Sequence, residues 1–168
     1  MTIPFLIQDA RQLPFQKEFD VALMLCEGGF PLMETDEMNF EILKNVTAAL
    51  KENGLFIFTT LNGLFPLHHS IQKFLSRDAE KDPIQFQKNH FDPITFREHF
   101  VLEFKDDLGN TQKITGTERY YIPSEITWQL KGLGFQQVEF FGAKLGQFSR
   151  KDTLTVDDFE MLVIAKLR

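Results

Sequence analysis

Four groups of side chains in this sequence belong to types that can do chemistry. The acid Asp9 follows a short apolar segment, and Cys26 and Glu27 stand directly before a pair of glycines. His68–His69 places two imidazoles side by side, and Arg119–Tyr121 joins a guanidinium to two phenols. Acids and imidazoles serve as general bases, a thiol can be a nucleophile, and the last group could line a binding pocket.

Each group also has an ordinary structural interpretation. Asp9 could cap a turn at the end of a strand, and Cys26 could be a small buried apolar residue. Glu27 could be a solvent-facing acid in a loop. Adjacent histidines project in different directions on a helix, so we expect no metal site at His68–His69 and consider substrate contact or an exposed helix surface there. Arg119–Tyr121 could pair across a hairpin, since aromatic residues favour strands.

The composition indicates one globular domain spanning residues 1–168. The hydrophobic fraction of 43% and charged fraction of 25% are ordinary for such a domain, whereas 19 phenylalanines favour a core or pocket wall rich in aromatic area. The net charge of −6 is unfavourable for a broad phosphate-binding surface, so we expect no nucleic-acid partner.

The single cysteine excludes an internal disulfide and is typical of a reducing, cytoplasmic setting. The amino terminus lacks the basic and long apolar regions of a signal peptide. No stretch reaches the roughly 18–20 apolar residues that a membrane span needs, so we expect no membrane partner.

The first third of the chain predicts a strand–helix–strand unit. Apolar runs predict strands at residues 3–7, 21–25 and 55–61, and a polar loop fills residues 9–17. Continuous apolar runs are typical of strands buried on both faces of a parallel sheet. Thr35 or Asp36 caps the predicted helix, its apolar spacing continues to Leu50, and Gly54 is its expected left-handed terminator.

Residues 62–122 differ in character and predict an inserted cap or lid. A short helix over residues 64–75 is interrupted by Pro66, and residues 76–93 are polar and irregular. Two β-capable runs, 96–104 and 112–121, flank an Asp/Gly/Asn turn at residues 106–110, which indicates a hairpin. An insertion of this size after a central strand usually forms a substrate wall.

The last third predicts a helix and two closing strands. Ser124 is the expected cap of a helix that runs to Leu133, with Gly134 ending it. Strands follow at residues 138–141 and 159–165, joined by a polar, basic loop over 144–158. The predicted fold is therefore α/β and mostly parallel, with a terminal antiparallel strand pair.

This order of motifs resembles class I S-adenosylmethionine-dependent methyltransferases. The apolar segment ending in Asp9–Ala10, the run at 21–25, the Leu50–Gly54 turn before the next strand, and the closing strand pair match the carboxyl-terminal two-thirds of that Rossmann-like fold. The resemblance implies methyl transfer from S-adenosylmethionine to a small-molecule acceptor.

The resemblance also implies roles for particular residues. Asp9 would accept a hydrogen bond from the adenine amino group, and the Ala10 N–H would face an adenine ring nitrogen. Leu25 and Cys26 would lie against the methionine part of the cofactor, and Glu27 is the candidate general base. The implied substrate contacts are Phe30, Asn62, His68, Arg119 and Tyr121, and the resemblance implies no metal ligand.

The sequence departs from the family at its start. The Gly-rich loop that cradles the cofactor, and the acid that holds its ribose, are not present in these 168 residues. We therefore expect impaired or absent activity in this chain, and a fragment of a longer protein is one explanation. A non-catalytic binding or interaction domain, and an unrelated α+β binding module, are the alternatives.

The missing strands would leave the run Val21 to Leu25 at an edge of the sheet, with unpaired N–H and C=O groups. The first strand could cross over and pair with it, or a second copy of the chain could cover it. We expect the second arrangement, a homodimer, because the short crossover has no helix to bury the sheet face.

Overall fold

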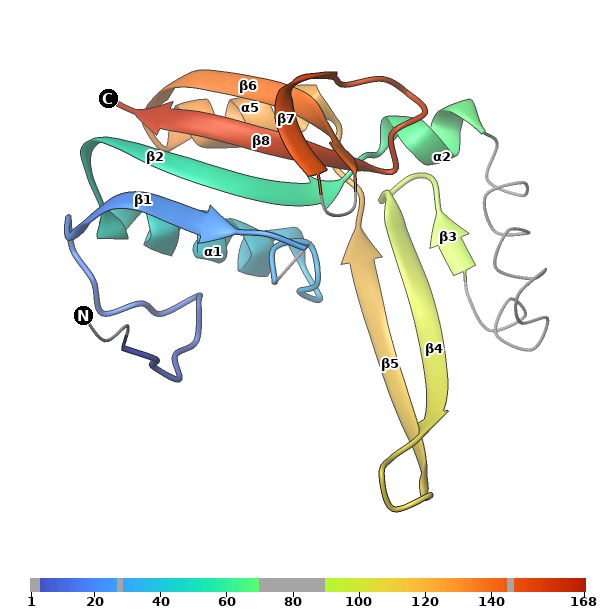
Figure 1. The fold of residues 1–168 in the computed structure, drawn as a ribbon. Helices are drawn as coiled ribbons and strands as arrows, with labels where there is room; N and C mark the ends of the chain where they lie inside the picture. Colours follow the sequence, from blue (N-terminus) through green and yellow to red (C-terminus); the bar gives the residue numbers. More distant parts are fainter. Residues whose placement is uncertain (1–3, 27–28, 70–89, 145–146) are drawn as a thin grey trace.

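The computed structural model describes residues 4–26, 29–69, 90–144 and 147–168 of the chain, shown in Figure 1. Five strands form the main sheet in the order β1-β2-β8-β6-β7, and three form a second sheet in the order β3-β4-β5. The strands are β1 Phe19–Met24, β2 Leu50–Leu61, β3 His90–Asp92, β4 Arg97–Lys105, β5 Thr111–Arg119, β6 Phe135–Lys144, β7 Gln147–Thr153 and β8 Glu160–Leu167. The helices are α1 Asp36–Ala49, α2 Leu64–His68 and α5 Pro123–Gly132. No helix in the described ranges is both long and apolar enough to span a membrane.

The main sheet is mixed, and the prediction of a mostly parallel sheet is wrong. Only β1 and β2 pair in parallel, whereas β8 runs antiparallel to both β2 and β6, and β7 runs antiparallel to β6. The closing antiparallel pair β6–β8 is as predicted. The α/β class and the order of the predicted central elements are confirmed.

The prediction of a strand at residues 3–7 is also wrong for residues 4–7, the part of it that the structure describes. Residues 4–9 adopt no regular structure, and Phe5 and Ile7 are almost fully exposed. Further along, the Asn45 side chain of α1 accepts from the Leu13 N–H and donates to the Arg11 carbonyl. The segment is therefore tied to a helix, and β1 keeps an open edge among the described residues.

Helix α1 forms where its sequence predicts it. The Thr35 hydroxyl accepts from the Met38 N–H at 3.2 Å, which satisfies one of the free donors of the first turn. The prediction that Gly54 ends this helix is wrong. The helix ends at Ala49, β2 starts at once, and Asn53 adopts the left-handed conformation (φ 62°), which Asn tolerates better than most residues.

The main core lies between the sheet and the two longer helices, which cover the same face in Figure 1. Phe56 and Phe58 of β2 stack at 4.5 Å and pack with Leu43 of α1 and Leu130 of α5. The opposite face carries Val21 and Leu23 of β1, which are 46% and 65% exposed. Because each is paired in register with an apolar residue of β2, an exposed apolar strip runs along this edge.

The predicted hairpin is present as β4 and β5, and the turn between them lies within residues 106–110. Figure 1 shows it projecting from the carboxyl ends of β1 and β2. Its base is joined to the main sheet, because Tyr121 N–H donates to the Leu61 carbonyl and Gly63 N–H donates to the Tyr121 carbonyl. Residues 70–89, which include most of the predicted irregular segment, lie outside the described residues, and the cap over 62–122 stays a prediction.

The last third differs from expectation in two details. Helix α5 begins at Pro123 with Ile122 rather than Ser124 at its cap, and the Glu125 carboxylate accepts from the Ile122 N–H. Gly134 takes the expected left-handed conformation, with φ 99°. The predicted loop over 144–158 contains β7, a polar strand at the sheet edge. Edge strands often carry charged residues, and β7 has no apolar pattern from which a strand could be predicted.

Candidate functional site

The loop that follows β1 is the first part of the candidate site. Leu25 and Cys26 emerge exposed at the carboxyl end of the strand. Phe30 returns the chain to the interior, where it is fully buried and stacks on Tyr121 with ring centroids 4.8 Å apart. In open α/β sheets ligands bind beyond the carboxyl ends of the strands, which is where this loop lies.

A groove of about 450 Å³ separates this loop from the hairpin. Leu32 and Glu34 line one side, and strands β4 and β5 line the other with a mixture of polar and aromatic residues. That volume falls in the range of small-molecule sites. The hairpin residues are His99, Phe100, Val101, Thr115, Gly116 and Thr117.

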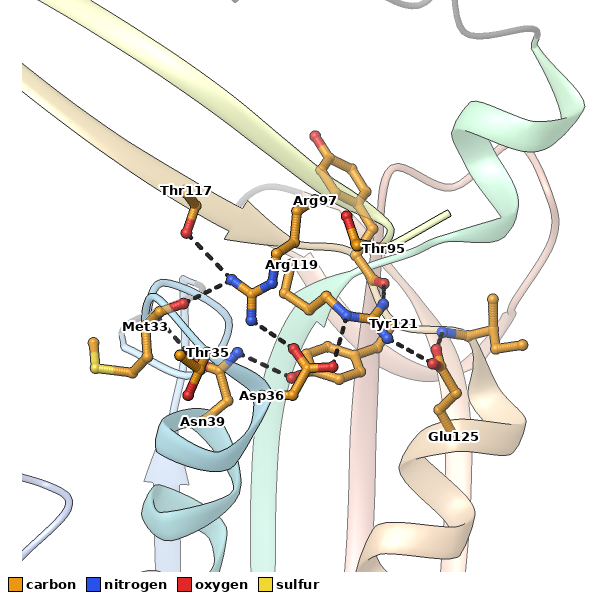
Figure 2. Close-up of polar contacts among 12 residues, drawn as sticks. Met33, Thr35, Asp36, Asn39, Thr95, Arg97, Thr117, Arg119, Tyr121 and Glu125 are labelled. Atoms are coloured by element: carbon orange, nitrogen blue, oxygen red, sulfur yellow. Dashed lines mark hydrogen bonds and ion pairs between the residues drawn. The ribbon is translucent and has the colours of Figure 1, made fainter. Parts of the chain in front are cut away.

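An ion-pair network joins the hairpin to α1 beside this groove (Figure 2). Asp36, in the first turn of α1, accepts from Arg97 of β4 at 2.5 Å and from Arg119 of β5 at 3.4 Å. Arg97 also donates to the hydroxyl of Thr117, which lines the groove, and to the Met33 carbonyl. The network therefore fixes the hairpin base against the loop and the helix.

Arg119 is the centre of the network. Each of its three nitrogens donates to a protein acceptor: Asp36, the Tyr120 carbonyl and the Glu125 carboxylate of α5. Its guanidinium carbon also lies 4.6 Å from the centre of the Tyr121 ring, a cation–π contact. One side chain thus connects α1, the end of β5 and α5.

The Tyr121 phenol is held in its neutral form. Burial is the main cause that raises its pKa above the ordinary value of a tyrosine, and the nearby charge of Asp36 adds to the increase. The Asn39 amide donates to its oxygen at 3.0 Å, deep in the interior. Tyr121 therefore packs in the core and accepts a hydrogen bond from Asn39, and it does not act as a base at neutral pH.

The structure brings several of the predicted substrate contacts together. Tyr121 stacks on Phe30, makes the cation–π contact with Arg119, and forms a parallel backbone bridge with Asn62. All four are buried. They form a packed, buried wall, and none of the four is among the residues that line the groove.

The other predicted residues lie apart from this wall. Asp9 and Ala10 are exposed in a turn of the amino-terminal segment, and His68 is on α2 beside Asp157. Glu27 lies outside the described residues. Their roles stay predictions.

The residues that sequence reasoning missed are those that depend on contacts between distant segments. Asp36 was predicted only as a helix cap, although its carboxylate meets arginines 61 and 83 positions away. Neither Arg97 nor Glu125 was predicted as a site residue. The one available signal was that these charged residues stand beside a strand end or a helix start. Sequence spacing alone does not show which of them form ion pairs.

Asp9 is engaged with its neighbour. Arg11 donates from its side chain to both carboxylate oxygens, at distances down to 2.6 Å, and its backbone N–H donates at 2.9 Å. These hydrogen bonds to Arg11 lower the pKa of Asp9 to about 2. An adenine amino group at Asp9 would have to share this carboxylate with Arg11.

We predict that Asp9 titrates at about 2 in an NMR pH titration. The Arg11→Gln variant should return the pKa toward roughly 3.9, the value of a free aspartate. Because the folded-state pKa is lowered, the contact stabilises the fold above the unfolded-state pKa and is lost as pH falls through about 2. A parent chain in which Asp9 already titrates like a free aspartate would contradict the ion pair.

No protein-family model and no curated protein matches this sequence significantly. Solved structures do match. The CcbJ methyltransferase of Streptomyces caelestis superposes with a TM-score of 0.68 at 11% identity, over 97% of this chain and 67% of that chain. An S-adenosylmethionine-dependent methyltransferase of Clostridium acetobutylicum gives 0.62 at 15% identity, over 96% and 63%. One from Methanosarcina mazei gives 0.53 at 16% identity, over 97% and 66%.

The chain therefore has a methyltransferase-like fold and spans about two thirds of the length of these proteins. The resemblance identified from the order of the sequence motifs is confirmed at the level of the fold. At sequence identities this low, the comparison establishes the backbone fold alone.

Proposed function

We propose that this chain takes part in methyl transfer from S-adenosylmethionine to a small-molecule acceptor. The observation that carries the proposal is the groove of about 450 Å³ between the loop that follows β1 and the hairpin, in a methyltransferase-like fold. Ligand sites of open α/β sheets occur at this position, and the groove has the size of a small-molecule site.

The proposed roles follow from this placement. S-adenosylmethionine would supply a methyl group on a sulfonium, whose sulfur is already a good leaving group. The protein has to align the acceptor with that methyl and exclude water. Leu25 and Cys26 would contact the cofactor, Asp9 and Ala10 would bind its adenine, and Glu27 would act as the base. The wall formed by Phe30, Asn62, Arg119 and Tyr121 would hold the acceptor groove in shape, with His68 as a further contact.

The fit of the cofactor to these 168 residues is incomplete. The sequence contains neither a Gly-rich loop nor a ribose-binding acid, and Asp9 is paired with Arg11. We propose that this polypeptide alone binds the cofactor weakly and has impaired activity. The whole activity would then need the missing groups from another segment.

The single thiol gives a direct test of the site. Cys26 is exposed at the end of β1 and is the only cysteine in the sequence, so its alkylation reports on this position alone. We predict that millimolar S-adenosylhomocysteine slows alkylation of Cys26 by iodoacetamide. A matched concentration of adenosine plus methionine is the control. An alkylation rate that the ligand leaves unchanged would reject a cofactor site at this strand end.

A non-catalytic binding or interaction domain is the second candidate. Every side-chain nitrogen of Arg119 donates to a protein acceptor, so the network supports the fold rather than binding a ligand. This observation favours the second candidate. Such a domain would keep the groove but would not protect Cys26 when S-adenosylhomocysteine is added.

We further propose a cytoplasmic homodimer that covers the open edge of β1. The exposed strip around Val21 and Leu23 supports this assembly, since an apolar edge strand readily pairs with another chain. Light scattering at high micromolar concentration should give twice the monomer mass. A monodisperse monomer would reject the dimer.

A further inference from the structure

Two adjacent histidines and an aspartate meet at the end of α2. His69 Nε2 lies 3.0 Å from Asp157 Oδ1, and His68 Nε2 lies 3.9 Å from the same oxygen. One ligand atom from each of the three residues can be chosen so that all lie within 4.8 Å of one another. The centroids of the two imidazole rings lie 5.1 Å apart, so the two side chains lie close together although the residues are adjacent.

The backbone around these residues is fixed by one buried side chain. The Asn62 amide group donates to the carbonyls of Thr155 and Asp158, and its oxygen accepts from the Leu64 N–H. Asn62 therefore ties the loop that carries Asp157 to the first residue of the helix that carries His68. The two halves of the cluster are held together before any ligand arrives.

The loop has its own internal supports. The Asp158 carboxylate accepts from both the N–H and the hydroxyl of Thr155, and the Thr155 hydroxyl accepts from the Asp157 N–H. Gly142 allows Asp158 to approach, since a Cβ there would lie 2.9 Å from a carboxylate oxygen. The orientation of Asp157 is thus set by a short, closely packed turn.

The His69 ring is positioned but lacks a hydrogen bond. It packs on Phe65 with ring centroids 4.5 Å apart, and Phe65 is in turn packed edge-on against Phe159. His69 Nε2 is buried and makes no hydrogen bond to the described residues, although the Asp157 carboxylate is near. A buried ring nitrogen without a hydrogen bond is unusual and is suited to a metal ligand.

We propose that His68, His69 and Asp157 bind a divalent transition-metal ion, with Zn²⁺ as the representative ion. Two imidazoles and one carboxylate are a typical zinc donor set, with water in the remaining position. Ligands on a tetrahedral zinc are about 3.3 Å apart when the bonds are about 2 Å long. The observed separations bracket that spacing, so rotation of the side chains is sufficient to close the site.

Access to the site is open. The side chains of His68 and Asp157 are 55% and 70% exposed, so an ion can enter from solvent. The bound metal would link the carboxyl end of β2 to the turn before β8. This role is independent of the proposed methyl transfer.

The test is a calorimetric titration of the 168-residue chain with Zn²⁺ in a Cys26→Ser background, which removes the single thiol as a competing ligand. We expect one saturable site per chain. Asp157→Asn and His69→Gln should each weaken binding at least about tenfold, the lower end of the effect of losing even a supporting contact at a metal site. Zn²⁺ should raise the melting temperature of the parent and not of these variants, because binding to the folded state stabilises it.

The matched control is the His90→Gln/His99→Gln double variant, which removes the remaining two of the four histidines. These two rings stack across β3 and β4 with centroids 6.4 Å apart, and their loss should leave the Zn²⁺ affinity unchanged. The proposal is overturned if the parent shows no saturable site. It is also overturned if the affinity falls in the double variant while Asp157→Asn and His69→Gln keep it.

Discussion

Replacing Arg119 with methionine is expected to lower the free energy of unfolding by about 3 kcal/mol. The guanidinium is buried and donates to Asp36, Glu125 and the Tyr120 carbonyl. Its removal leaves Glu125 without its cation and Asp36 with Arg97 alone. Breaking a buried ion pair costs about 3–5 kcal/mol, and the lower end applies because water still reaches Asp36 and Glu125.

Thermal unfolding measures this effect directly, with an expected fall in melting temperature of roughly 6–12 °C. Arg150→Met is the matched control. Arg150 is 62% exposed and 3.5 Å from Glu139, so its loss should cost no more than about 0.5 kcal/mol. If both variants unfold at the same temperature as the parent, the network does not hold the hairpin base.

Asn62→Ala is expected to destabilise the fold by a similar amount, about 3 kcal/mol. The substitution removes three hydrogen bonds at a fully buried position. It leaves the Asp158 carbonyl and the Leu64 N–H without this partner, whereas the Thr155 carbonyl still accepts from the Asp158 N–H at 3.4 Å. Each unsatisfied buried group costs about 1–3 kcal/mol, and relaxation of the loop reduces the sum.

Chemical denaturation with two-state analysis gives the value. Asn110→Ala is the control, because Asn110 lies in the exposed hairpin turn and, among the described residues, its side chain donates to Asp106 alone. A small loss for Asn110→Ala beside a large loss for Asn62→Ala is the expected pattern. Equal, small losses would contradict the role of Asn62 as the tie between β2, α2 and the loop before β8.

The parts of the fold that could be predicted are those that depend on local sequence. Helix α1 follows from its apolar spacing and the Thr35 cap, and the hairpin follows from two β-capable runs around an Asp/Gly/Asn turn. The direction of strand pairing is a property of distant segments. The antiparallel pairing of β8 with β2 could not be predicted from the apolar run of β8, because such a run looks the same in a parallel sheet.

The two errors about strands have opposite causes. Residues 4–7 are apolar but have no neighbouring strand to pair with, so a favourable composition produced no strand. Strand β7 is polar but has β6 beside it, and backbone pairing outweighed its composition. In both cases the presence or absence of an adjacent strand, which depends on the whole fold, determined whether a strand formed.

The carboxyl end of β1 could be predicted, whereas none of the residues that line the groove was predicted as a site residue. The end of β1 was identified from the apolar run and the residues that follow it. Arg119 and Tyr121 were predicted as pocket residues, but they do not line the groove and lie instead in a buried network with Asp36. That network joins three segments far apart in the sequence, so no spacing rule could reveal it.

Isothermal titration of the 168-residue chain with S-adenosylmethionine tests the central claim most directly. The chain has the groove and the strand end but no Gly-rich loop, and each missing contact is worth about 1–3 kcal/mol. We predict saturable binding with a dissociation constant far above roughly 1 µM. A dissociation constant near or below roughly 1 µM would contradict the claim that affinity depends on the missing loop. An absence of binding at millimolar cofactor would reject a cofactor site formed by these 168 residues alone.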